Sequence, residues 1–114
     1  MPSQVLTTEA NELSTYVVRF TFRDENGDLV VPTSLTWTLT DVLGAVVNSR
    51  TKQVVSPTSS VVDILLTGSD LALGTFAGTK RVLTVEGKYT SALGSDLALK
   101  DDVTFVIRPL IGVS

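Results

Sequence analysis

The stretch Ser34-Leu35-Thr36-Trp37-Thr38-Leu39-Thr40-Asp41 alternates apolar and polar residues along almost its whole length. Leu35, Trp37 and Leu39 fall on one side of an extended chain, and the serine and the threonines fall on the other. A period of two residues is that of a β-strand with one apolar face, on which threonine and tryptophan are both favoured. Trp37 is the only tryptophan, and burying such a ring removes on the order of 200 Å² from water. We therefore predict a strand that places Trp37 at the centre of the core.

A second stretch, residues 16–23, alternates in the same way and is also predicted to be a strand. It is followed by Asp24-Glu25-Asn26-Gly27-Asp28, in which Asn-Gly is typical of a tight turn. The acids of this turn lack the glycine and the late glutamate of an EF-type calcium loop. We therefore expect a polar hairpin turn there, with no specific calcium site.

Further short strands are predicted at residues 29–31, 45–48, 54–55, 60–66, 80–89 and 103–110. Residues 60–66 carry apolar side chains on both faces, which is typical of a central strand or one covered on both sides. Gly87, inside the predicted strand 80–89, indicates a bulge or a close approach of another backbone. We expect a single helical or 3₁₀ turn at 68–74, and a long loop or an edge hairpin at 90–102.

About seven short strands, with a turn signal roughly every ten residues, predict an all-β fold: a single antiparallel immunoglobulin-like β-sandwich. Residues 14–114 form this one domain, and the polar, unpatterned residues 1–13 form an N-terminal arm. The inward positions of the predicted strands make up the structural core, which is expected to contain Phe20, Phe22, Leu35, Trp37, Leu39, Ile64, Leu83, Val85, Phe105 and Ile107.

The composition narrows the classes of partner. Charged residues make up only 18% of the 114 residues, and the net charge of −3 argues against nucleic acid as the main partner. The apolar runs are far shorter than the ~20 residues that cross a bilayer, so no membrane contact is expected. Met1-Pro2-Ser3-Gln4 is not basic and precedes no apolar segment, so we expect synthesis in the cytoplasm without a signal peptide.

The residue types that carry most catalysis are missing. The chain has no histidine and no cysteine, which removes the commonest general base, the commonest metal ligand and thiolate chemistry. No serine lies in a nucleophile-elbow pattern, and residues 74–80 lack the spacing of a phosphate-binding loop. We expect no catalytic residue, no cofactor and no metal, and therefore a protein that is not an enzyme.

One segment of the sequence resembles bacterial and phage immunoglobulin-like modules. It runs from Phe22 through the Asp24–Asp28 turn to Pro32, and continues from Trp37 through a second turn to Asn48. Residues 82–89 and 103–105 continue the likeness, which covers roughly residues 16–110. A cysteine-free module with a polar arm is similar to small accessory proteins of tailed-bacteriophage virions. The resemblance implies a virion structural protein, most simply a capsid decoration protein.

Two alternatives stay open: a neck or tail protein of the head–tail connection, and a host-surface or carbohydrate-binding module. The partners implied by the resemblance are other virion proteins, namely major capsid or neck and tail subunits, together with copies of the chain itself. The terminal segments do not alternate but carry apolar residues, so we expect them to order against a neighbouring subunit. The predicted contact residues are Val5, Leu6, Leu110, Ile111 and Val113.

Overall fold

The structure, a computed structural model, is all-β and describes residues 4–5, 9–73 and 79–108. A single 3₁₀ turn, η1 (Gly68–Leu71), lies at the position where one was expected. The strands are β1 (Gln4–Val5), β2 (Ala10–Asn11), β3 (Thr15–Thr21), β4 (Ser34–Asp41), β5 (Gln53–Val54), β6 (Val61–Thr67), β7 (Lys80–Ser91) and β8 (Gly94–Arg108).

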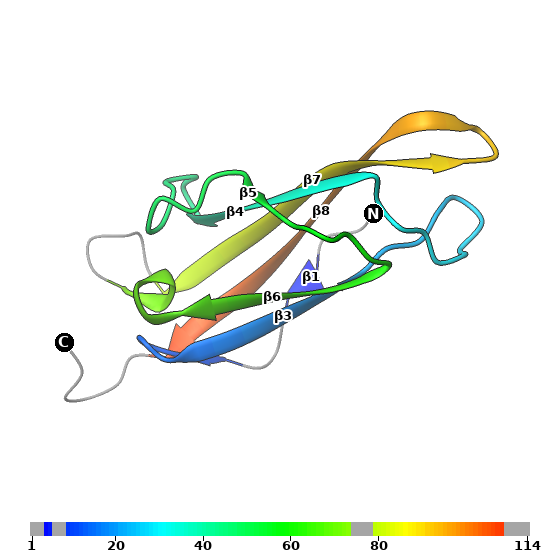
Figure 1. Cartoon of the computed structure of the whole chain (residues 1–114). Coiled ribbons are helices and arrows are strands. Elements are labelled where there is room, and N and C mark those ends of the chain that lie inside the picture. The colour runs from blue at the N-terminus through cyan, green and yellow to red at the C-terminus, as the bar shows by residue number, and fades with distance from the viewer. Residues whose placement is uncertain (1–3, 6–8, 74–78, 109–114) are drawn as a thin grey trace.

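The strands form two sheets that lie one over the other (Figure 1). The larger sheet has the order β1-β8-β7-β4-β5, with β2 also paired to β8. The smaller sheet consists of β3 and β6, which pair antiparallel from Thr15–Thr67 to Thr21–Val61. Both β1 and β2 run parallel to β8, so the expectation of purely antiparallel pairing is wrong.

The N-terminal arm pairs with its own chain. Gln4 and Val5 lie beside Val103 and Thr104 of β8, and Ala10 is 1% exposed within the core. This differs from the expectation that residues 1–13 order against a neighbouring subunit. The reason is that the outer edge of β8 offers unpaired backbone groups, which the extended pieces of the arm satisfy. Of the other predicted contact residues, Leu6, Leu110, Ile111 and Val113 lie outside the described residues.

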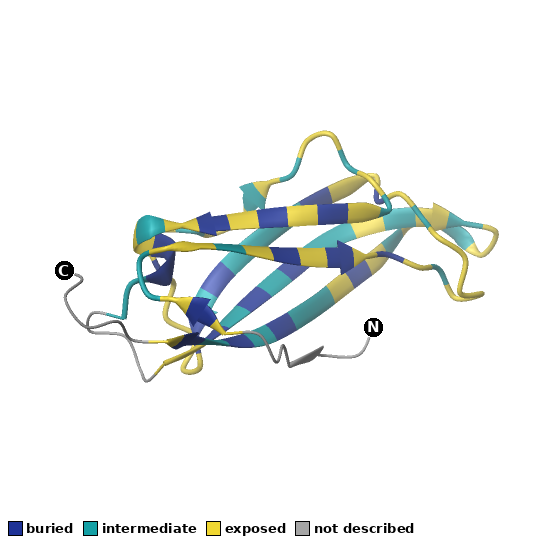
Figure 2. Ribbon diagram, turned by 90° about the horizontal axis from the view of Figure 1, so that it is seen from below, coloured by how far each residue is buried: buried dark blue, intermediate teal, exposed yellow. Residues whose placement is uncertain are grey.

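The core fills the space between the two sheets. In Figure 2 the strands β3 and β6 show alternating buried and exposed residues, as expected for strands with one face on a core. Nine of the ten predicted core residues are buried, and they are Phe20, Phe22, Leu35, Leu39, Ile64, Leu83, Val85, Phe105 and Ile107.

Trp37 is the exception, because it is only partly buried and packs against the core from its margin. The guanidinium of Arg50 lies 5.9 Å from the centre of its ring. The strand β4 lies near the edge of the larger sheet, where its neighbour β5 has only two residues. A second sheet of two strands is too narrow to cover that edge, so the prediction that Trp37 is central is wrong.

One other local expectation needs correction, and one open alternative is decided. The strand β6 is buried on one face alone, and Val61 and Leu65 on its other face are exposed. Of the two alternatives for residues 90–102, the hairpin is correct, because β8 begins at Gly94 and forms a long hairpin with β7 that extends beyond the rest of the fold (Figure 1). Asp101 is therefore a strand residue that is half-buried, and burial raises the pKa of its carboxyl group.

Candidate interaction surface

The outer face of the smaller sheet carries apolar and charged side chains in register. Val17 lies opposite Leu65, and these side chains are 52% and 58% exposed. Arg19 lies opposite Asp63, and its guanidinium donates two hydrogen bonds to the carboxylate, with lengths of 2.8 and 3.1 Å. We call these four residues, Val17, Leu65, Arg19 and Asp63, the outer patch.

The ion pair between Arg19 and Asp63 holds the two side chains against each other but contributes little to the stability of the fold. The hydrogen bond and the charge of Asp63 raise the pKa of Arg19, and the hydrogen bond from Arg19 lowers the pKa of Asp63. Both side chains are in water, which screens such pairs strongly. The hydrogen bonds nevertheless keep the positive charge of Arg19 neutralised by Asp63, beside the exposed Val17.

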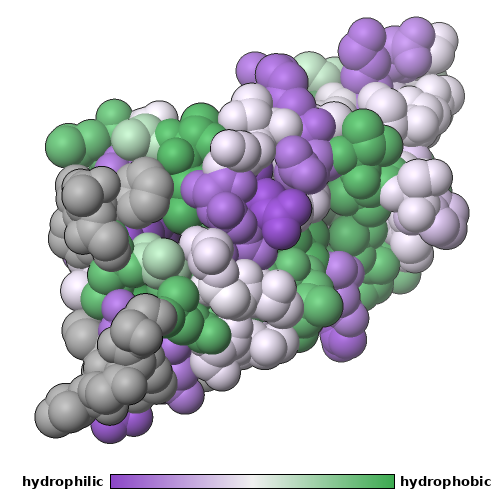
Figure 3. Space-filling model, turned by 60° about the vertical axis from the view of Figure 1, so that its left-hand side comes forward, coloured by the Kyte–Doolittle hydropathy of each residue, from purple (hydrophilic) through white to green (hydrophobic). Residues whose placement is uncertain are grey.

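Apolar patches also lie between hydrophilic ones on the η1 side of the molecule (Figure 3).

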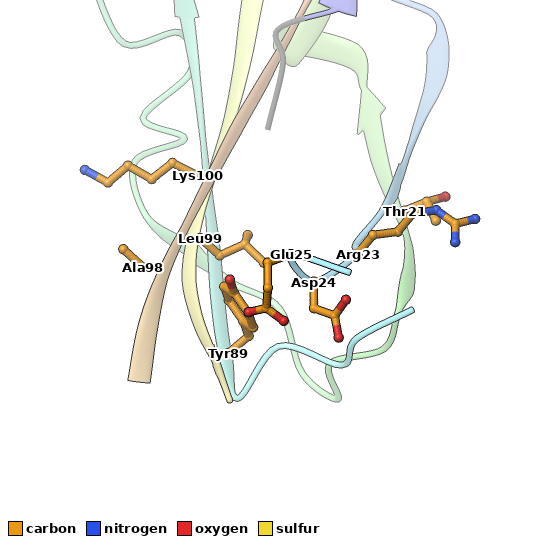
Figure 4. Close-up of a pocket in the computed structure, with 8 residues that line it drawn as sticks. All are labelled: Thr21, Arg23, Asp24, Glu25, Tyr89, Ala98, Leu99 and Lys100. Atoms are coloured by element: carbon orange, nitrogen blue, oxygen red, sulfur yellow. The ribbon is translucent and has the colours of Figure 1, made fainter. Parts of the chain in front are cut away.

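A hollow of about 430 Å³ lies where the turn at residues 24–28 approaches the β7–β8 hairpin. In Figure 4 the side chains of Lys100 and Arg23 point away from the hollow on opposite sides. The hydroxyl of Ser91 donates a 2.7 Å hydrogen bond to Glu25 and so joins the turn to the hairpin. The lining residues are Thr21, Arg23, Asp24, Glu25, Tyr89, Ala98, Leu99 and Lys100.

The acids of this hollow have local structural partners. The carboxylate of Asp24 accepts hydrogen bonds from the backbone N–H groups of Asn26 and Asp28, at 2.9 and 3.0 Å. These bonds hold the turn in the shape that its Asn-Gly sequence predicts. In the described ranges, no three acidic side chains come close enough together to hold a metal ion.

Three charged groups, Asp41, Asp70 and Arg81, are buried at the opposite end of the sandwich, and the sequence did not single them out. Arg81 is fully buried, and its guanidinium donates to the carbonyl oxygens of Lys80, Ala72 and Leu73 at 2.8, 3.3 and 3.4 Å. Burial lowers the pKa of Arg81, and the charge of Asp41, its neighbour across the β4–β7 pair, opposes that shift. In the sequence, Arg81 alternates with Leu83 and Val85 on one side of the strand 80–89, and this pattern is the only signal of its burial.

Asp70 is another of these buried charges, with 1% of its surface exposed. Its carboxylate accepts hydrogen bonds from Arg50 at 2.7 Å, from Asn48 at 2.8 Å and from the backbone N–H of Thr67 at 3.1 Å. Burial alone raises the pKa of Asp70, but these hydrogen bonds outweigh it, so the pKa is lower than that of a free carboxyl group. The cluster ties the segment that covers β4 to the end of β6.

A pH prediction follows from the lowered pKa of Asp70. The stabilisation it provides is complete above the unfolded-state pKa of about 4 and is lost as the pH falls through the lower folded-state value. We expect Asp70→Asn to lower the free energy of unfolding by about 1.5–3 kcal/mol at pH 7. Urea unfolding of both proteins at pH 7 and at acidic pH measures the difference, which should shrink in acid. A difference that is equal at both pH values would show that the charge of Asp70 does not contribute.

The described residues include no helix long and apolar enough to span a membrane. Comparison with known proteins identifies no relative: no family model matches the chain, and neither a curated protein nor a solved structure matches it significantly.

Proposed function

We propose that this chain is a non-enzymatic structural protein of a tailed-phage virion that acts through protein–protein contacts, as a capsid decoration protein. The observation that carries the proposal is the outer patch, because Val17 and Leu65 are apolar, adjacent and exposed on a regular sheet face. Contiguous apolar surface of this kind on a small domain is typical of a contact site. The virion setting comes from the sequence resemblance to phage immunoglobulin-like modules.

We also propose that the fold is immunoglobulin-like. The order β8-β7-β4-β5 of the larger sheet corresponds to strands G, F, C and C′ of that fold. The pair β3–β6 corresponds to strands B and E, and the chain crosses between the sheets from β3 to β4 and from β6 to β7. Among the described residues no strand flanks B or E as in a constant-type domain, so the smaller sheet has two described strands.

Quantitative mass spectrometry of purified particles from the phage that encodes the chain tests the virion role. A copy number comparable with that of the major capsid protein supports a decoration protein. A few copies per particle would instead support the alternative of a neck or tail protein. Complete absence of the chain from particles that contain all their other structural proteins would overturn the proposal.

The second candidate, a carbohydrate-binding module of the host surface, is favoured by the hollow beside Tyr89. Its lining combines one aromatic ring with the carboxyl groups of Asp24 and Glu25. In variable immunoglobulin domains the loops at the corresponding end form the binding site. Titration of the chain with a panel of saccharides, followed by NMR, should then shift resonances of these residues. Loss of the shifts in Tyr89→Ala would support sugar binding at this hollow.

A further inference from the structure

The sheet edges of this protein are protected to different degrees. The outer edge of β8 is covered by β1 and β2. The edge of β4 is covered by the segment that follows it, because Val47 and Val55 donate to the carbonyl oxygens of Leu39 and Leu35. On β6 the N–H of Thr67 donates to the carboxylate of Asp70. Unpaired edges are sites at which another chain can add a strand, so natural proteins protect them.

In the part of the chain that the structure describes, the edge of β3 that faces away from β6 lacks the protection found at the edges of β8, β4 and β6. No described strand pairs with this edge. It has seven residues in unbroken register, with no proline, glycine or bulge. Its one charged residue, Arg19, is neutralised by Asp63. Within the described residues, this edge therefore carries no proline, bulge or unneutralised charge that would prevent pairing.

The hydrogen bonds that flank the β3–β6 pair show which backbone groups point to the open edge. Phe22 donates to the carbonyl oxygen of Ser60, and Gly68 donates to that of Ser14. In an antiparallel pair such bonds alternate, so the even-numbered residues of β3 direct their backbone groups at β6. The odd-numbered residues Thr15, Val17, Arg19 and Thr21 therefore direct theirs at the open edge, and their side chains lie on the exposed face.

We propose that two copies of the chain pair antiparallel through β3 around a two-fold axis at Val18, forming one four-stranded sheet. This inference deepens the proposed function, on whose contact-forming role it rests, by naming a partner and a surface. Val18 is the middle residue of β3, so an axis there pairs all seven residues of the strand. Val17 then pairs with the partner's Arg19, and Thr15 pairs with the partner's Thr21. An axis at Arg19 would place two arginines directly opposite each other, which is unfavourable.

The residues of β3 and β6 can pair with a second copy about this axis without opposing like charges, which favours a second copy as the occupant of this edge. In the four-stranded sheet, one row across the strands contains Asp63, Arg19, the partner's Val17 and the partner's Leu65. The two-fold axis repeats that row in reverse, so each ion pair meets the apolar pair of the other copy and no like charges are opposed. Pairing also converts two narrow two-stranded sheets into one of four strands, and sheets of three or more strands are much more stable.

The test measures self-association of the full chain by sedimentation velocity over a range of concentrations, with two variants of opposite charge at one position. Val17→Lys places a positive charge opposite the partner's Arg19, and we expect dimerisation to weaken by roughly tenfold or more. Val17→Glu places a negative charge there, and we expect the dimer to be retained or strengthened. Both variants lose the same apolar side chain at an exposed position, and circular dichroism checks that both remain folded.

A second pair of variants identifies the edge. Val17→Pro removes an N–H that faces the open edge of β3, and Leu65→Pro removes the equivalent N–H on the outer edge of β6. Neither substitution removes a donor from the β3–β6 ladder, so the two are matched in their cost to the fold. We expect only Val17→Pro to produce a monomer. If proline prevents folding, the Lys and Glu variants alone decide the question.

Three outcomes would overturn the inference. They are a wild-type chain that stays monomeric at sub-millimolar concentration, a dimer that responds equally to Val17→Lys and Val17→Glu, and a dimer lost in Leu65→Pro but kept in Val17→Pro. Each leaves the virion proposal intact, because the presence of the chain in particles is measured independently. Binding of a different virion protein by a wild-type chain that is itself monomeric would likewise exclude a second copy as the occupant of this edge.

Discussion

Replacing Gly87 by alanine is expected to lower the free energy of unfolding by about 3 kcal/mol or more, at the upper end of overpacking substitutions. Gly87 lies in β7 opposite Leu35 of β4. A Cβ atom added there would overlap the carbonyl oxygen of Ser34 and lie only 3.2 Å from the Cα of Leu35. These are backbone atoms, so the clash can be relieved only by separating the two strands inside the larger sheet.

Gly44→Ala is a suitable control for this substitution. Gly44 has a φ of +89°, and no atom lies within 4 Å of the position of an added Cβ. Its substitution introduces backbone strain without a clash, and we expect a loss of about 1–2 kcal/mol. Urea unfolding of both variants measures the two losses. If Gly87→Ala is no more destabilising than Gly44→Ala, the close approach of β4 and β7 is wrong.

Phe105→Ala is expected to be the most destabilising truncation of a core side chain, at about 3–5 kcal/mol. Phe105 is fully buried in β8, and its ring lies 5.0 Å from that of Tyr16 in the smaller sheet. The side chain therefore contributes to the packing of one sheet on the other. Such a loss is a large part of the 5–15 kcal/mol by which a domain of this size is usually stable.

Trp37→Ala provides the comparison, and we expect it to cost less than Phe105→Ala. The ring of Trp37 is only partly buried, and its contact with the guanidinium of Arg50 contributes about 0.5–1 kcal/mol. Chemical unfolding of the two variants under the same conditions ranks them. A greater loss in Trp37→Ala would contradict the structure and restore Trp37 to the centre of the core.

The alternation of residues 16–22 and 34–41 was enough to predict two strands and the side of each that is buried. This succeeds because a strand with one face on the core must repeat every two residues. Gly87 was interpreted from its position in a strand, and the structure confirms a close backbone approach there. These features are local, since each is decided by a residue and its immediate neighbours in sequence.

The outer patch was missed although its signal was present in the sequence. Residues 60–66 carry apolar side chains on both faces, which was interpreted as a sign of burial on both sides. The structure exposes Val61 and Leu65 instead. A pattern of this kind reports that both faces are apolar, and it does not report whether anything within the same chain covers them.

The sequence alone therefore determined the class of fold, most of the core and the turn at residues 24–28, because each depends on local periodicity and turn chemistry. The tertiary structure alone decided the parallel pairing of the arm with β8, the partial exposure of Trp37 and the burial of Arg81 and Asp70. It also decided that no described strand pairs with the outer edge of β3. These features depend on which strands become neighbours, and neighbours in a sheet are set by pairing between residues far apart in the sequence, on which a local pattern carries no information.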